Sequence, residues 1–63
     1  MFIELTLTDG GKMMINTMYI EQFSPNDENQ YYTDIFMNSD PDVPYVVRET
    51  YHEICMKLAN QIK

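Results

Sequence analysis

Two side chains capable of nucleophilic chemistry, His52 and Cys55, lie three positions apart near the C-terminal end of the sequence. On a helix, residues three apart are neighbours, so the imidazole could take a proton from the thiol. Such a pair also needs a third group to orient the histidine and a pocket for substrate. Cys55 falls instead among apolar residues at helical spacing, where a buried thiol is an inert hydrophobic group. We therefore expect packing and surface roles for this pair.

A second group of side chains is spaced like the ligands of a calcium-binding loop. Positions 1, 3, 5 and 12 of that loop would be Asn38, Asp40, Asp42 and Glu49. The sixth position must be glycine to allow a sharp turn, and here it is Val43, followed by Pro44. The sequence therefore predicts a solvated loop without a metal, and it offers no cofactor site.

Arg48, Glu49 and Glu53 resemble an acid–base set, but they surround a predicted helix start. Thr50, followed three residues later by Glu53, has the form of a capping box. Glu49 would lie favourably beside the positive end of the helix dipole. We expect structural roles for these residues and no catalytic residue in the chain.

The elements that would position these side chains begin with a hairpin. Residues 2–8 alternate between apolar and polar types, the pattern of a strand buried on one face. Gly10 and Gly11 favour a tight turn before a return strand at 13–15. The polar residues at 16–18 then predict a bend or a single helical turn.

Three more strands are expected at 19–23, 31–37 and 45–48, with polar loops at 26–30 and 38–43. The first of them should stop at Ser24 and Pro25, because proline cannot donate to a strand ladder. The strand at 31–37 carries large apolar groups on both faces, which favours a central or doubly covered position.

An amphipathic helix follows Thr50. Its apolar residues recur at helical spacing and are Tyr51, Ile54, Cys55, Leu58, Ala59 and Ile62. The sequence thus predicts one small α+β domain over residues 1–63, an antiparallel β-meander of four to five short strands with one C-terminal amphipathic helix packed on one face. The uncovered face would hold Phe2, Glu4, Thr6, Tyr32, Asp34 and Phe36.

Charge and hydropathy exclude several classes of partner. Ten acidic and four basic residues give a net charge of −6, which disfavours direct binding to nucleic-acid phosphates or to anionic membranes. No apolar run approaches the roughly 20 residues that a membrane-spanning helix needs. Without a signal peptide and with a single cysteine, the chain is expected in the cytoplasm.

Self-association is expected from the size of the domain. A chain of 63 residues buries only about 60% of its unfolded surface, and small domains often gain a disulfide, a metal or a second subunit. One cysteine excludes an internal disulfide, and one histidine with one thiol does not suggest structural zinc. A homo-oligomer is the remaining common solution.

Five tyrosines and six methionines exceed what one small core can hide. Tyrosine is enriched at interfaces, and methionine packs readily against varied partners. The predicted interface residues are Met14, Met18, Tyr19, Tyr31, Tyr32 and Phe36. Ordinary packing within one subunit remains the alternative for these side chains.

A family resemblance rests on several short matches spread over nearly the whole chain. They are Leu5-Thr6-Leu7, Asp9-Gly10 with Lys12, Ile15-Asn16, Tyr19-Ile20-Glu21, Tyr45 to Thr50, and Glu53-Ile54. In this order they resemble the flagellar FlbD (SwrD) family of very small bacterial proteins. The chain differs by Gly11 and by longer loops at 25–30 and 38–43. The resemblance implies this fold and a role in flagellar motility, and similar short chains also occur in phages and mobile elements.

Two functional hypotheses follow. The first is a non-enzymatic cytoplasmic protein–protein interaction module that resembles FlbD. The alternative is an acidic phage or mobile-element accessory protein that inhibits a host nucleic-acid-binding enzyme. Such an inhibitor should line its acidic residues along one ridge, whereas an adaptor should spread them. An enzyme would require His52, Cys55 and a carboxylate to converge in a pocket.

Overall fold

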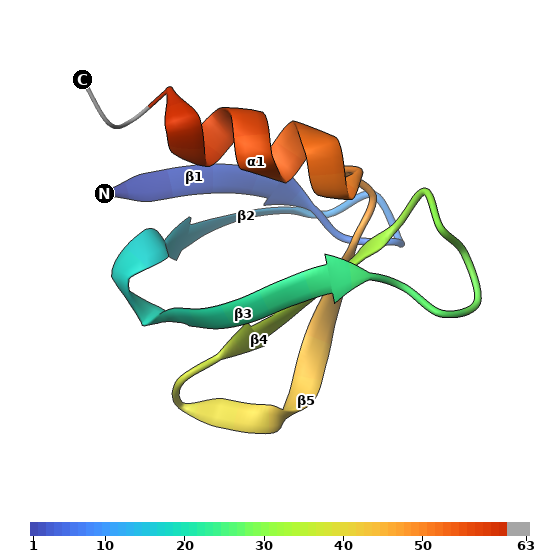
Figure 1. Cartoon of the computed structure of the whole chain (residues 1–63), viewed down its shortest axis with the longest axis horizontal. Helices are drawn as coiled ribbons and strands as arrows, with labels where there is room; N and C mark the ends of the chain where they lie inside the picture. The colour runs from blue at the N-terminus through green and yellow to red at the C-terminus, as the bar shows by residue number, and fades with distance from the viewer. Residues whose placement is uncertain (61–63) are drawn as a thin grey trace.

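The computed structural model describes residues 1–60, which form two antiparallel sheets and one C-terminal helix (Figure 1). The elements are β1 (Phe2–Thr6), β2 (Lys12–Asn16), the 3₁₀ turn η1 (Thr17–Tyr19), β3 (Ile20–Pro25), β4 (Thr33–Met37), β5 (Asp40–Val47) and α1 (Tyr51–Ala59). The predicted α+β meander with a terminal helix is confirmed.

The β1–β2 hairpin closes through a three-residue turn that requires glycine. The Leu7 N–H donates to the Gly11 carbonyl at 2.7 Å, and the Gly10 N–H donates to the Leu7 carbonyl at 2.9 Å. Gly10 has a φ of 96°, a left-handed conformation that other residues adopt only with strain. The Asp9 carboxylate accepts from the Gly11 N–H at 2.8 Å and fixes the second glycine. The predicted hairpin is therefore confirmed.

The turn η1 divides the meander into its two sheets. The Asn16 side chain accepts from the Met18 N–H at 3.0 Å, which starts the single helical turn that the sequence predicts. The first sheet holds β1 and β2, and the second has the order β3-β4-β5. A bridge between Leu7 and Val47 joins the end of β1 to the end of β5.

The central position predicted for β4 is confirmed, whereas the strand bounds around it differ from the prediction. Tyr31 and Tyr32 precede β4, and β3 continues to Pro25, which pairs with Thr33. Of the predicted loop at 38–43, only residues 38–39 form a turn, and residues 40–43 begin β5. The β4–β5 register shifts between Ile35 and Met37. A bulge at an edge strand can accommodate proline, so β5 contains prolines that are more typical of a loop in the sequence.

The helix α1 begins at the predicted capping box and closes the core. The Glu53 N–H donates to the Thr50 hydroxyl at 3.1 Å, and the Thr50 N–H donates to the Glu53 carboxylate at 2.8 Å. Ile54 is fully buried, and the Tyr51 ring lies 5.1 Å from the Phe23 ring. The buried apolar side chains of the described residues are Ile3, Leu5, Ile15, Ile35, Val47 and Ile54. The predicted stripe residue Ile62 lies outside the described residues.

Candidate interaction surface

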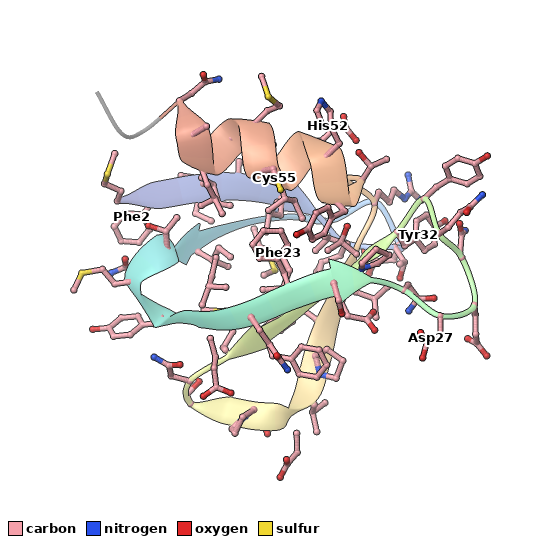
Figure 2. The ribbon with its side chains drawn as sticks, in the orientation of Figure 1. Phe2, Phe23, Asp27, Tyr32, His52 and Cys55 are labelled. Atoms are coloured by element: carbon pink, nitrogen blue, oxygen red, sulfur yellow. The ribbon has the colours of Figure 1, made fainter. Side chains whose placement is uncertain are left out.

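The side chains with nucleophilic character do not converge. Figure 2 shows His52 on the side of α1 away from the strands and Cys55 on the side that faces Phe23. His52 is exposed, and Cys55 is half-buried with a free thiol. Residues 1–60 form no pocket. The same residues contain no group of three or more His, Cys, Asp or Glu side chains placed to hold a metal ion.

Glu49 makes the side-chain hydrogen bonds that span the greatest sequence distance within the described residues. Its carboxylate accepts from the Thr6 N–H at 2.9 Å and from the Thr6 hydroxyl at 3.0 Å, across 43 residues of sequence. Its carbonyl accepts from the hydroxyl of the buried Thr33 at 2.7 Å. Lys12 Nζ donates to the Thr6 hydroxyl at 3.0 Å. Glu49 therefore joins both sheets to the start of α1 and does not simply complement the helix dipole.

Arg48, the residue before Glu49, also bonds to the first hairpin. Its N–H donates to the Thr6 carbonyl at 2.7 Å. Its guanidinium donates to the Thr8 carbonyl through Nε at 3.2 Å and through the terminal nitrogen at 2.7 Å. We call Thr6, Thr33, Arg48 and Glu49 the sheet junction. Most of its hydrogen bonds hold backbone groups in place, so its geometry is that of a structural joint.

The capping carboxylate has an altered titration. The Thr50 backbone N–H, and after it the Thr50 hydroxyl, stabilise the ionised carboxylate and lower the pKa of Glu53 below its ordinary value of 4.5. Glu53 is exposed, so water screens this effect. The shift follows from the cap itself and marks no reactive group.

The six predicted interface residues separate into three places. Met14, Met18 and Tyr19 lie together on β2 and η1 and are 60%, 73% and 55% exposed. Tyr31, 66% exposed, lies in the loop before β4, where Tyr32 is half-buried. Phe36, also half-buried, lies on β4. Figure 2 shows Tyr32 at the opposite end of the molecule from Phe2, the first residue of β1.

Phe2 belongs to the first group through strand register. Phe2 pairs with Asn16 and Glu4 pairs with Met14, and paired residues of antiparallel strands share a face, so Phe2 and Met14 are diagonal neighbours. Phe2 is 57% exposed. The Thr17 N–H donates to the Met1 carbonyl at 2.8 Å and so holds η1 beside the start of β1. We call Phe2, Met14, Met18 and Tyr19 the β2–η1 patch.

The size of this patch is notable for so small a molecule. Side chains of this kind each offer about 200 Å², so at these exposures the patch presents on the order of 500 Å². That is near the upper end of the largest apolar patch on an ordinary monomer, where such patches are often functional. The alternation of apolar and polar residues along β1 places Phe2 on this face. The turn at Asn16 then brings η1 beside Phe2.

Charge is absent from the segment that carries most of the patch. Residues 13–20 contain no charged side chain, although 22% of the chain is charged. The ten acidic residues occupy β1, β3, β4, β5, the loops and α1, and none lies on β2 or η1. The segment at 13–20 is therefore uncharged, and the charged residues nearest to it in the hairpin are Glu4, which pairs with Met14, and Lys12.

Within residues 1–60, no helix combines the length and the apolar character that crossing a membrane requires. Comparisons with protein-family models, with curated proteins and with solved structures find no match to this chain.

Proposed function

We propose that this chain is a non-enzymatic protein-interaction module of the cytoplasm that resembles the FlbD-type flagellar motility proteins. The observation that carries the proposal is the β2–η1 patch, which leaves four large apolar side chains mostly in water on one surface. Burial of such a patch against a partner is favourable by about 25 cal/mol for each Å² of apolar surface removed from water.

The chemistry of the patch suits a protein partner. Met14 and Met18 have unbranched, polarisable side chains that adapt to irregular apolar surfaces. Phe2 and Tyr19 add rigid rings, and tyrosine offers a hydroxyl at the rim of a contact. This combination of aromatic and methionine side chains is typical of interface cores.

The distribution of acidic residues bears on the alternative function. An acidic inhibitor that occupies a nucleic-acid groove needs its carboxylates along one ridge. Here they are spread over four strands, the loops and the helix of the described chain. This arrangement supports the interaction module over the inhibitor.

The proposal can be tested by quantitative affinity capture from the cells that produce the protein. Wild type is compared with the double variant Met14→Ser/Met18→Ser and with Met56→Ser, which alters an exposed methionine on α1. Central apolar contacts commonly contribute more than 1 kcal/mol each, so the double variant should lose its specific partners by about tenfold or more. Met56→Ser should retain them.

Equal recovery of the same partners by wild type and the double variant would contradict the proposal. A substrate turnover abolished by Met56→Ser or by His52→Ala, with the patch intact, would contradict it as well. The folded state of each variant is checked by circular dichroism, so that loss of binding is not confused with unfolding.

A further inference from the structure

The outer edge of β2 is a strand edge that the fold leaves unpaired. β2 pairs with β1 alone, and β3 pairs with β4 alone, among the described residues. An open edge presents a row of free N–H and C=O groups that can template another strand. The edges of the second sheet are protected: β3 has a register shift near Ile20 and ends at Pro25, and β5 carries Pro41 and Pro44. β2 has no proline and no bulge.

Two hydrogen bonds identify which backbone groups of β2 point outward. The Thr6 N–H and carbonyl bond to Glu49 and Arg48, away from β2, so the pair of Thr6 with Lys12 is a wide, non-bonded pair. Because wide and narrow pairs alternate, Met14 and Asn16 also occupy wide pairs. The bond from Thr17 to Met1 falls where the alternation requires a narrow pair. The N–H and C=O of Met14 therefore face away from β1, at the centre of the open edge.

We propose that a second copy of this chain pairs with this edge, β2 against β2 in antiparallel orientation, with the twofold axis at Met14. The two Met14 residues exchange both of their outward backbone bonds, and the Asn16 N–H of each copy reaches the Lys12 carbonyl of the other. The result is one continuous four-stranded sheet. This inference rests on the proposed function, since it names the partner of the β2–η1 patch.

Charge favours a second copy. The pairing brings together residues 12–16 of the two copies, and β2 contains no acidic residue. Each copy carries a charge of −6, so two copies repel except where they meet on neutral surface. The uncharged residues 13–20 supply such a surface, whereas a basic partner would instead favour the acidic elements. Higher salt should strengthen the dimer, because it screens this repulsion.

The twofold axis provides a specific test, because it places position 14 opposite itself. Sedimentation velocity of the full chain from about 1 to about 300 μM should show a monomer–dimer equilibrium. Met14→Lys and Met14→Glu should each weaken the dimer by about a hundredfold, since like charges then face each other. An equimolar mixture of these two variants should restore a dimer, which native mass spectrometry identifies as the mixed species. Met56→Lys and Met56→Glu, on α1, should leave dimerisation unchanged.

A second variant tests the backbone contact. Met14→Pro removes an N–H that faces solvent in the monomer, so the fold should persist while the dimer weakens by at least tenfold. Met14→Ser retains the N–H and should weaken it less. A wild type that stays monomeric over the whole range would overturn this inference. If patch-dependent capture persisted in that case, the proposed function would stand with a strand from another protein on this edge. If neither Met14→Lys nor Met14→Glu changed the dissociation constant of the dimer, the placement of the twofold axis at Met14 would be wrong.

Discussion

The sheet junction and the β2–η1 patch lie at opposite ends of the same hairpin and use their side chains in opposite ways. At the junction, Glu49 and Arg48 bond to β1 and to the turn after it, and Thr33 is fully buried with its hydroxyl paired. At the patch, Met18 and Tyr19 stand mostly in water. No buried polar side-chain atom lacks a partner in residues 1–60. The fold satisfies its polar groups while it leaves large apolar groups exposed.

This difference separates the residues that hold the domain together from those available to a partner. A domain of this size has a stability of only a few kcal/mol, so every junction bond matters. Exposed apolar side chains on the surface contribute little to that stability. Substitutions at the two regions should therefore produce opposite phenotypes, with loss of folding at one and loss of binding at the other.

The largest expected effect is at the junction. Glu49→Ala removes two hydrogen bonds to Thr6, one of them to backbone, and should lower the free energy of unfolding by about 2 kcal/mol. For a chain of this length the melting temperature should fall by roughly 10 °C. Thermal and urea denaturation followed by circular dichroism measure the change. In Glu49→Gln the amide oxygen can still accept one hydrogen bond, so the free energy of unfolding should fall by less. A Glu49→Ala variant as stable as wild type would remove the contrast between the regions.

A smaller effect should appear with pH at the helix cap. The pKa of Glu53 is lowered in the folded chain by the Thr50 bonds, so the unfolded chain binds the proton more readily at acid pH. The contribution of Glu53 is therefore complete above its unfolded pKa and is lost as the pH falls through the lower, folded value. Melting curves between about pH 6 and about pH 3 should show this loss. Glu53→Gln keeps a capping-box acceptor and should show a weaker pH dependence. Identical pH profiles for the two proteins would contradict the assignment.

The smallest effect on stability should come from the patch. Met18→Ser in dilute solution should change the free energy of unfolding by less than about 0.5 kcal/mol, because Met18 is 73% exposed. Ile54→Ala, at a fully buried position of α1, is the reference and should cost about 2–5 kcal/mol in the same urea titration. A large loss for Met18→Ser would mean that the patch belongs to the core of the monomer.

Local sequence patterns predicted the local structure well. The glycines of the hairpin, the turn at Asn16, the central place of β4 and the cap formed by Thr50 and Glu53 are confirmed. In each case the residues that cause the structure lie within a few positions of one another. The start of β5 was missed because Pro41 is typical of a loop, and only pairing with β4 makes it part of a strand.

Long-range arrangements could not be predicted in the same way. The partners of Glu49 are 43 residues away, and nothing near Glu49 in the sequence indicates Thr6. The candidate interface shows the same limit: composition indicated a surplus of tyrosine and methionine, but register and the turn η1 decide which of them share a surface. Phe2 enters the patch for that reason, and Tyr31, Tyr32 and Phe36 lie elsewhere.

The bridge between Leu7 and Val47 has a consequence for biosynthesis. During translation the first hairpin can form as soon as it leaves the ribosome, since its contacts are local. It cannot join the second sheet until residues 47–49 have emerged, and the core stays open until Ile54 follows. Until these residues emerge, the nascent chain exposes β2 and its apolar neighbours without the rest of the domain, and cooperative folding must wait for them.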